Sequence, residues 1–451
     1  MIRSKNDKTR RAFLKKFATG TAVLTGAPSI LNATSSNSEL ARPTSFYSAN
    51  DHVQIALIGA GWMGVEDTES ALKVPGTKLV GVCDLYDGRL QAAKAKWGKD
   101  LFTTKDYRQI LDRPDVDAVI IGTPDHWHKQ ISIDAMSKGK SVYCEKPMVH
   151  NVNEGPAVIE AQNKNKVTFQ VGSQGLSSLG NEKAKELYEQ GAIGQLLYAE
   201  GFWARNSPQG AWQYMVPKDA SEKTVDWKRY TSNTTQRKFD PFRFFRWRNY
   251  RDYGTGVSGD LFVHLFSSLH YVISSKGPEK IVATGGLRYW KDGREVPDVL
   301  LGMFDYPKTE DHPAFNLSLR VNFVDGTSGS TYLRLVGSEG AMDIKWREVV
   351  LRKNQSFDPM GDAYHSIEKK DQRKKMMPPA EYVYKAEEGY KGAHYDHFNH
   401  FFKGVRDKST VVEDALFGYR AAAPALLCND SYFNNKIIYW DPEQMTLLKP
   451  K

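Results

Sequence analysis

One apolar run that ends in three spaced glycines constrains this chain more than any other feature. Residues 53–58 are almost entirely apolar, and Gly59-Ala-Gly61-Trp-Met-Gly64 follows at once. This pattern predicts a buried parallel strand that turns directly into a helix. Gly59 permits the tight turn, Gly61 lets the backbone approach a pyrophosphate, and Gly64 lets the helix press on the sheet. The helix N-terminus then faces the anion, so the motif predicts a dinucleotide site.

An acidic residue at the end of a second apolar run supports this prediction. Residues 78–83 read as another buried strand, and Asp84 lies twenty positions beyond Gly64. At that spacing a carboxylate reaches the hydroxyls of the adenosine ribose. Asp84 favours NAD over NADP because it would repel a 2′-phosphate. In the alternative interpretation, the glycines are ordinary turn residues and Asp84 is an ordinary surface residue. That interpretation has to explain why the strand, the turn, the helix and the acid occur together.

The first third of the chain has the alternation of a doubly wound parallel sheet. Two predicted strand ends carry polar groups, namely Gly122 to His128 and Glu145-Lys146-Pro147. Ligands bind outside the carboxyl ends of such strands, so both ends are expected to flank the cofactor crevice. Strands are predicted at 53–58, 78–83, 117–122, 141–144 and 167–171, and helices at 87–97, 104–112, 127–138 and 152–164.

Past residue 180 the pattern changes to a second, mainly antiparallel sheet. A helix near 181–190 and an extended run at 196–204 precede a long aromatic region, and closely spaced β-like runs follow between 280 and 352. Residues 353–392 are polar and are predicted to be an irregular loop. Helices are predicted at 394–405 and 412–428, the second packing back on the nucleotide domain. The fold class is therefore an N-terminal α/β Rossmann domain plus an α+β domain with a large antiparallel sheet.

The predicted domain boundaries follow from these changes. They are a signal peptide over 1–33, a linker over 34–50, an NAD-binding domain over 51–175, a substrate and oligomerisation domain over 176–409, and a C-terminal helix and tail over 410–451. The signal peptide rests on Thr9-Arg10-Arg11-Ala12-Phe13-Leu14-Lys15, which resembles the twin-arginine export consensus, and on the short, broken apolar stretch that follows. That route exports folded proteins, so a periplasmic protein with a tightly held cofactor is expected. A basic tail is the alternative.

Charge and cysteine content exclude other classes. The formal charge is +9, but residues 1–33 contribute +6 and leave about +3 for the rest, with no basic block that nucleic-acid binding needs. No stretch is long and apolar enough to predict a membrane span. Three cysteines without metal-ligand spacing predict buried free thiols. His394, His397 and His400 are spaced by three and lack supporting acids, so no metal site is predicted.

Asp260 and His264 form the second chemical signal. They lie four residues apart, so on a helix they share one face, and the carboxylate could orient the imidazole. Such a pair is also a common structural feature, and both interpretations stay open on spacing alone.

From Val53 to about Asp441 the chain resembles the Gfo/Idh/MocA family of oxidoreductases. The matching features are the glycine motif, Asp84, Thr123-Pro124 with His128, Glu145-Lys146-Pro147, Gly259-Asp260-x-x-x-His264 and Trp440-Asp441-Pro442-Glu443. The resemblance implies that His264 is the acid/base and that Lys146 stabilises the alkoxide. It also implies that Asp260 orients His264, and that a homodimer or homotetramer forms through the open sheet. Cofactor contacts are assigned to Gly59, Gly61, Trp62, Met63, Gly64, Asp84, Thr123, Pro124, His128, Glu145, Lys146 and Gln174.

The aromatic and basic region before Asp260 predicts a carbohydrate substrate. Sugars bind through aromatic faces against their C–H surfaces and through charged groups that fork to neighbouring hydroxyls. Substrate contacts are assigned to Trp203, Arg205, Arg246 and Trp247. Many of these aromatic residues could instead belong to the core.

The predicted function is oxidation of a secondary hydroxyl of a glycoside or free sugar with NAD, at C3 in the favoured version. An NAD-dependent glycosidase that works by transient oxidation is the first alternative. Relatives of that kind generally depart from Glu-Lys-Pro at the lysine, which this chain keeps. A non-catalytic sugar-binding protein is the second alternative, and it predicts loss of Lys146, Asp260 or His264, all of which are present.

Overall fold

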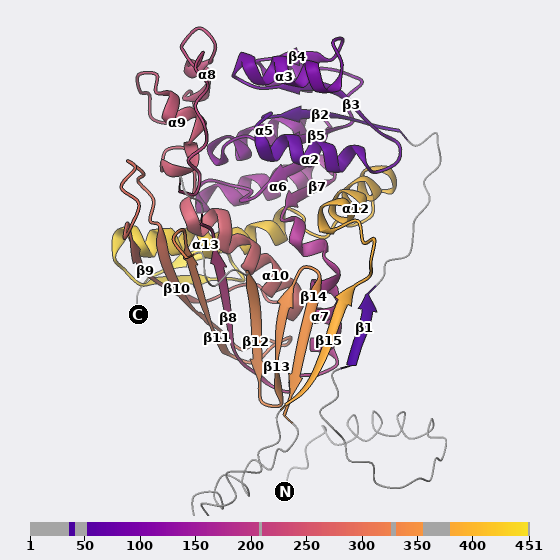
Figure 1. The fold of residues 1–451 in the computed structure, drawn as a ribbon, viewed down its shortest axis with the longest axis vertical. Helices are drawn as coiled ribbons and strands as arrows, with labels where there is room; N and C mark the ends of the chain where they lie inside the picture. Colours follow the sequence, from indigo (N-terminus) through magenta and orange to yellow (C-terminus); the bar gives the residue numbers. More distant parts are fainter. Residues whose placement is uncertain (1–35, 41–51, 207–209, 326–330, 355–378, 450–451) are drawn as a thin grey trace, which may run out of the picture. The chain divides into compact units, whose positions relative to one another are not determined.

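The computed structural model describes residues 36–40, 52–206, 210–325, 331–354 and 379–449 (Figure 1). The predicted export signal at residues 9–15 lies outside them. Two sheets organise the described chain: one has six strands, and the other has eleven.

The six-stranded sheet is the predicted dinucleotide fold. Its order is β4-β3-β2-β5-β6-β7, and all neighbours are parallel. β2 pairs with both β3 and β5, so the strand order reverses beside β2, where the glycine turn begins. The strands are β2 (Val53–Ile58), β3 (Thr77–Cys83), β4 (Phe102–Thr104), β5 (Ala118–Ile121), β6 (Ser141–Glu145) and β7 (Phe169–Gly172).

Helices cover both faces of this sheet, as the doubly wound pattern requires. Buried side chains of α4, α5 and α6 join the core on one face, and α2 and α3 contribute to the core on the other. The helices are α2 (Trp62–Leu72), α3 (Asp87–Trp97), α4 (Tyr107–Leu111), α5 (His128–Ser137) and α6 (Gly155–Asn165), with the 3-10 turns η1 (Asp125–Trp127) and η2 (Val152–Glu154).

A late helix completes the α2 face of the sheet. α12 (Ala393–Asp407) lies beside α2 and β7 (Figure 1). Its Phe398, Phe401 and Phe402 are fully buried against the sheet, where Phe398 stacks on Tyr143. Residues 393–407 fall within the predicted second domain, 176–409, whereas their apolar side chains pack in the first domain.

The large sheet has the order β1-β15-β14-β13-β12-β8-β11-β10-β9-β16-β17. Most neighbours are antiparallel, and β8 with β11 and β1 with β15 are the parallel pairs. Burial alternates along β10, β11, β12 and β13, so only one face is covered. The strands are β1 (Ser36–Leu40), β8 (Leu196–Ala204), β9 (Lys280–Gly286), β10 (Val299–Tyr306), β11 (Phe315–Asn322), β12 (Tyr332–Gly337), β13 (Gly340–Lys345), β14 (Glu348–Lys353), β15 (Ala380–Ala386), β16 (Ile438–Asp441) and β17 (Thr446–Leu448).

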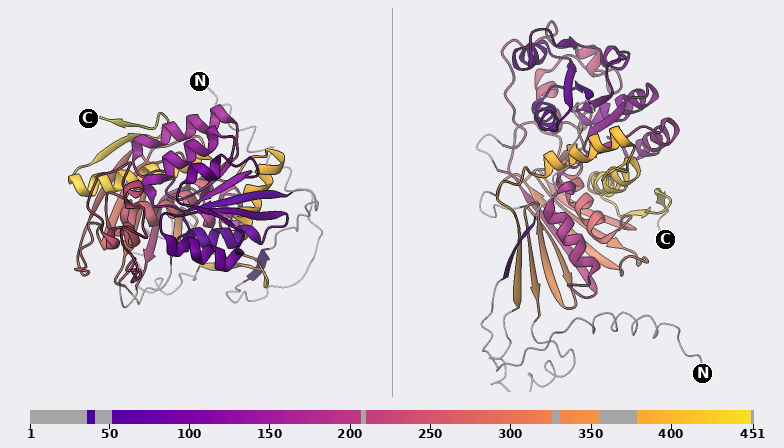
Figure 2. Two further views of the ribbon diagram at one scale, coloured as in Figure 1. Left: turned by 90° about the horizontal axis from the view of Figure 1, so that it is seen from above. Right: turned by 90° about the vertical axis from the view of Figure 1, so that its right-hand side faces the viewer.

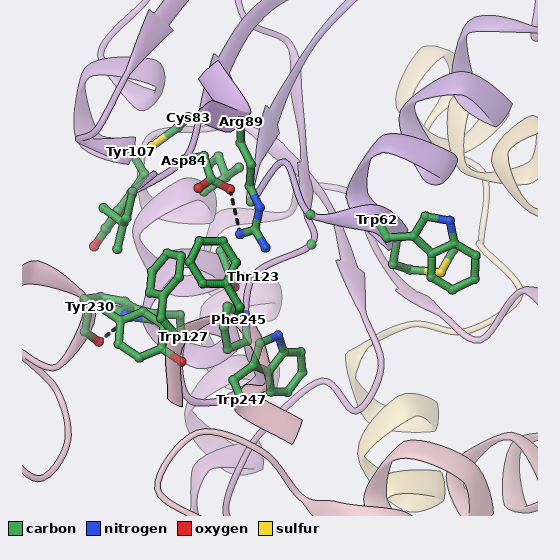
Figure 3. Close-up of a pocket in the computed structure, with 18 of the residues that line it drawn as sticks. Trp62, Cys83, Asp84, Arg89, Tyr107, Thr123, Trp127, Tyr230, Phe245 and Trp247 are labelled. Carbon is green, nitrogen blue, oxygen red and sulfur yellow. Dashed lines mark hydrogen bonds and ion pairs between the residues drawn. The ribbon is translucent and has the colours of Figure 1, made fainter. Parts of the chain in front are cut away.

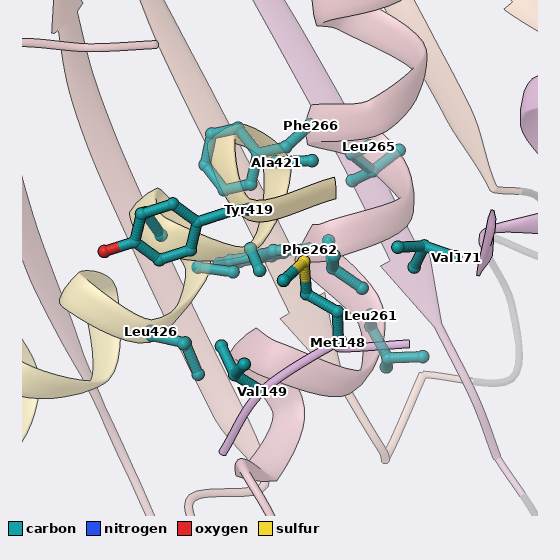
Figure 4. Packing of buried hydrophobic residues seen from close by; sticks show 14 of the residues in the cluster. Met148, Val149, Val171, Leu261, Phe262, Leu265, Phe266, Tyr419, Ala421 and Leu426 are labelled. Carbon is teal, nitrogen blue, oxygen red and sulfur yellow. The ribbon is translucent and has the colours of Figure 1, made fainter. Parts of the chain in front are cut away.

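Three helices lie along the covered face (Figure 2). α10 (Val263–Ile273) is central, and α7 (Leu179–Glu189) and α13 (Ala415–Asn434) flank it. α13 also reaches the first domain: Tyr419 and Leu426 lie near Met148 and Val149 (Figure 4). The Tyr419 hydroxyl donates to the Val152 carbonyl at 2.7 Å. The two domains therefore share one continuous core.

Two sequence predictions are wrong in this region. Residues 380–386 form β15 rather than an irregular loop, because they pair with β14 along their whole length. Residues 36–40, predicted to be linker, form β1 on the outer side of β15.

Between β8 and α10 the chain makes a long excursion with short helices: α8 (Trp227–Tyr230), α9 (Pro241–Phe245) and η4 (Trp247–Asn249). In Figure 1, α8 and α9 lie beside the Rossmann domain rather than along the large sheet. We call residues 210–256 the cap segment.

Candidate active site

The glycine turn after β2 has the conformation that the motif requires. Gly59 has φ +95°, and a Cβ there would lie 2.6 Å from the Gly122 carbonyl carbon. A Cβ on Gly64 would lie 2.1 Å from the Gly59 oxygen, so the helix presses directly on the turn. A Cβ on Gly61 would meet nothing nearer than the Arg89 side chain at 3.9 Å. The turn is packed on the sheet side and open on the ligand side, which fits a bound pyrophosphate.

Asp84 lies at the end of β3 beside this turn. Its carboxylate accepts hydrogen bonds from the Ala60 amide at 2.8 Å and the Tyr86 amide at 2.9 Å. Arg89 pairs with the same carboxylate at 3.4 Å. These contacts hold the acid at the position from which it can bind ribose hydroxyls.

A cavity of about 220 Å³ opens between these groups. Figure 3 shows Asp84 and Arg89 on one side of it and Phe245, Tyr230 and Trp247 of the cap segment on the other. Seven of the twelve predicted cofactor residues line it: Gly59, Gly61, Trp62, Met63, Asp84, Thr123 and Pro124.

Neither Gly64 nor His128 is among the residues that line this cavity. The two ring nitrogens of His128 contact the Pro147 carbonyl at 2.7 Å and the Thr123 carbonyl at 2.9 Å. Both oxygens are acceptors, so both nitrogens donate and the ring is an imidazolium. Burial opposes this, but Cys144 and Asp125 raise the pKa of His128 to about 10. His128 thus ties together the two loops at the ends of β5 and β6.

Glu145 and Gln174 form a buried network with an acid that sequence analysis missed. The Gln174 amide donates to Glu145 at 2.5 Å and to Asp67 at 3.3 Å. Burial, together with the charge of Glu145, raises the pKa of Asp67 well above its ordinary value. Burial also raises the pKa of Glu145. Asp67 and Glu145 are therefore expected to retain a proton between them. In the sequence, only the spacing of Asp67 on α2 could have indicated this acid.

Lys146 and Asp260 meet across the two domains. Lys146 Nζ donates to Asp260 Oδ1 at 2.7 Å and to the Asp260 carbonyl at 3.0 Å. Arg248, which sequence analysis also missed, donates to the same Oδ1 at 3.2 Å. Burial would raise the pKa of Asp260, but the Lys146 and Arg248 cations hold that pKa well below its usual range. Asp260 is therefore an anion between two cations.

The predicted pairing of Asp260 with His264 is not formed among the described residues. Ser258–Phe262 is a π-helical turn that leads into α10, so Asp260 and His264 lie in different helical segments. Asp260 turns to Lys146 instead, and His264 Nδ1 is buried without a hydrogen-bond partner in the described structure. Burial and the nearby Lys146 charge hold the pKa of His264 well below its ordinary value, so the imidazole is neutral.

His264 also lines a second cavity, of about 240 Å³. Trp203 stacks on the imidazole with ring centres 5.2 Å apart, and Trp346 meets it edge-on at 6.4 Å. Arg205 lies over the Trp203 ring at 5.8 Å. Polar and aromatic groups from four elements complete the wall, including Asn181, Ser268, Tyr332 and Lys345. Trp346, Tyr332 and Asn181 were not predicted, because they come from separate parts of the sequence.

Residues 53–173 match the family model described as oxidoreductase family, NAD-binding Rossmann fold (GFO_IDH_MocA). The matched segment spans all six strands of the parallel sheet. It is an NAD-binding Rossmann domain, as the glycine turn and Asp84 predicted.

Two curated relatives resemble this chain over part of their length. Inositol 2-dehydrogenase of Salmonella typhimurium is 32% identical over 33% of this chain and 45% of its own. An α-N-acetylgalactosaminidase of Shewanella oneidensis is 31% identical over 49% of this chain and 50% of its own. The chain thus spans about half the length of the curated relatives it matches.

Solved structures match almost the whole fold. An NAD-binding protein from Listeria innocua has a TM-score of 0.61 at 19% identity and covers 86% of this chain and 96% of its own. A levoglucosan dehydrogenase in complex with NADH and levoglucosan has a TM-score of 0.60 at 18% identity and covers 86% of this chain and 99% of its own. The two-domain fold of this chain is therefore a known one.

Two predicted substrate residues have other contacts. Arg246 donates to the Tyr214 carbonyl at 2.8 Å and to the Gln213 side chain, which makes it a brace within the cap segment. Trp247 lines the dinucleotide cavity and lies under Arg248, 4.2 Å from its guanidinium. Neither residue reaches the cavity beside His264.

The C-terminal histidines take part in packing. His397 bonds the Val171 carbonyl and the Ser177 hydroxyl, both at 2.7 Å. Within the described ranges, no cluster of three or more His, Cys, Asp or Glu residues is arranged to hold a metal. In the same ranges, no helix has the length and apolar character that a bilayer crossing requires.

Proposed function

We propose that this chain oxidises a secondary hydroxyl of a carbohydrate with NAD. The observation that carries the proposal is the meeting of Lys146, Asp260 and a neutral His264 between the dinucleotide cavity and an aromatic one. Oxidation of a sugar hydroxyl removes a proton from its oxygen and a hydride from its carbon. A base and a fixed cation promote loss of the proton, and an aromatic platform positions the sugar.

Each residue has a defined task. His264 Nδ1, a neutral acceptor without a partner in the described structure, takes the hydroxyl proton. Lys146 donates to the same oxygen and stabilises its developing negative charge. Asp260 holds the Lys146 ammonium in place, and Arg248 balances the charge of Asp260. NAD, when bound, supplies the acceptor for the hydride. The glycine turn and Asp84 orient it, and the buried core excludes water.

A carbohydrate fits the second cavity better than a steroid or a simple acid. Its wall alternates aromatic faces, Trp203, Tyr332 and Trp346, with the amide of Asn181 and the hydroxyl of Ser268. The inositol dehydrogenase relative also acts on a cyclic polyol, by its name. Within this class we favour C3 of a glucoside, because a ketone there acidifies the C2 proton and allows a partner enzyme to eliminate the aglycone.

A second candidate function has its own support. The α-N-acetylgalactosaminidase relative covers more of this chain than the inositol dehydrogenase does. A glycosidase that oxidises, eliminates, adds water and reduces would use the same NAD and the same base without net redox change. Lys146 in its bond with Asp260 favours the dehydrogenase. A non-catalytic binding protein has no need of this charged trio.

We also propose an exported, periplasmic protein with tightly held NAD, on the strength of Arg10-Arg11 and the apolar stretch after it. We also propose that the chain forms a homo-oligomer. The uncovered face of the large sheet exposes Val282, Leu301 and Met303 on neighbouring strands, an apolar surface that a second copy could bury.

Titration of the purified chain with glucosides and free sugars, followed at 340 nm without added nucleotide, tests the function. We expect a rise of one equivalent that a keto sugar reverses and that Lys146→Ala abolishes. Release of aglycone without any rise would instead favour the glycosidase. If NAD added in excess restores neither reaction, the proposed function is wrong.

A further inference from the structure

The cap segment, residues 210–256, lies over the dinucleotide cavity and not over the cavity beside His264. Its buried aromatic residues form one cluster with the Rossmann domain: Tyr86, Val225, Trp227, Tyr230, Phe244, Phe245 and Tyr253. Of these, Tyr230, Phe244 and Phe245 line the dinucleotide cavity directly. The cluster is therefore a wall of that cavity.

The cap segment is attached to the loop after β3, which carries Asp84. Tyr86 and Val225 form a β-bridge. The Asp87 amide donates to the Thr224 carbonyl at 3.0 Å, and the Asp226 amide donates to the Leu85 carbonyl at 2.9 Å. Backbone bonds of this kind do not depend on side-chain rotamers, so the attachment is firm.

A second attachment lies at the loop after β5. The ring nitrogens of His126 and Trp127 both contact the Tyr230 carbonyl at 3.1 Å, and the Asn233 amide donates to the His126 carbonyl at 2.7 Å. The loops after β3 and β5 flank the adenosine half of a Rossmann crevice. The cap segment bridges them and closes that half.

Arg89 joins the wall to Asp84. Its guanidinium pairs with the Asp84 carboxylate at 3.4 Å and lies 5.6 Å from the Phe244 ring and 5.4 Å from the Phe245 ring. Phe245 in turn meets Tyr86 edge-on at 5.1 Å. A nucleotide that left through this side would have to separate Arg89 from both rings and expose them to water.

We infer that the cap segment retains NAD by enclosing its adenosine half, with Phe244, Phe245 and Arg89 as the closing contacts. The inference rests on the proposed function only in that NAD is the ligand.

The dissociation rate of NAD tests this inference without any sugar. The full chain is loaded with radiolabelled NAD and diluted into excess unlabelled NAD, and the label that stays bound is followed by gel filtration. We expect at least a tenfold faster release from Phe245→Ala than from the wild type. Phe242→Ala is the matched control, since Phe242 is on the same helix but 48% exposed, and its rate should be unchanged.

Tyr86→Phe is a gentler second variant, because it removes only the 2.7 Å hydrogen bond to Asp219 and leaves the ring in place. It should release NAD several-fold faster with an unchanged circular dichroism spectrum. Equal rates in the wild type, Phe245→Ala and Tyr86→Phe would overturn the role of the cap segment and leave the sugar oxidation untouched. Failure of the wild type to bind NAD would overturn both proposals.

Discussion

Lys146, directly after β6, and Asp260, in the π-helical turn before α10, are joined twice, through the Asp260 carboxylate at 2.7 Å and through its backbone carbonyl at 3.0 Å. The double contact fixes the ammonium in direction as well as in position. It also leaves one lysine proton free for a substrate oxygen.

Lys146→Ala is expected to lower the rate of sugar oxidation by about 10²–10⁴-fold, because one fixed cation at the developing charge is lost. Bound NAD should remain, since Lys146 is absent from the cavity wall around Asp84. Single-turnover absorbance at 340 nm measures the rate, and Lys138→Ala, at an exposed lysine, serves as the control. A loss of less than about threefold would remove Lys146 from the mechanism.

The acid side of the pH profile reports on His264. Because burial and Lys146 lower its pKa, the neutral imidazole persists below the ordinary His pKa of about 6.5. We therefore expect kcat/KM to stay level as the pH falls from 8 to 6. Initial rates across that range check this, and an acid limb near pH 6.5 that disappears in His264→Asn would contradict it.

Trp346→Ala is expected to weaken sugar binding while NAD binding stays intact. Trp346 lies at the turn between β13 and β14 and faces His264 edge-on. Loss of one aromatic face in a sugar site is worth about 1–2 kcal/mol, which corresponds to a KM about tenfold higher. Tyr289→Ala, at a 61% exposed tyrosine outside that cavity wall, is the control. An unchanged KM would place the sugar elsewhere.

Glu413 makes stability pH-dependent. Burial raises the pKa of its carboxyl to about 8, and the Ser267 hydroxyl donates to it at 2.9 Å. The folded pKa is above the unfolded one, so the stabilisation is complete below about pH 4.5 and is lost as the pH rises to about 8. Glu413→Gln should therefore have a higher melting temperature than the wild type at pH 9. The opposite order in calorimetry would mean that burial does not raise the pKa of the Glu413 carboxyl.

The sequence predicted the Rossmann half closely, because buried parallel strands are continuous apolar runs and their turns carry glycine. β15 escaped prediction because it alternates poorly, with Glu381 and Lys385 among its seven residues, and is formed mainly by pairing with β14. The motif identified Asp260 as a site residue but not Lys146 as its partner. The π-helical turn that contains Asp260 could not be predicted from residue spacing. The sequence showed that the region near 230–250 is rich in aromatic residues. It did not show that they lie over the dinucleotide cavity, because that position depends on the contact between Tyr86 and Val225, which are far apart in the sequence.

α12 has a consequence for how this chain is made. Val53, Ile55 and Leu57 leave the ribosome early, yet the phenylalanines that cover them follow only at residues 398–402. A growing chain must carry the part of this apolar sheet face that α12 covers exposed, or leave the sheet unformed, through most of its synthesis. The first domain is thus the first to be translated and among the last to be completed. A truncated chain that ends before α12 should therefore bind chaperones rather than fold into a soluble nucleotide-binding protein.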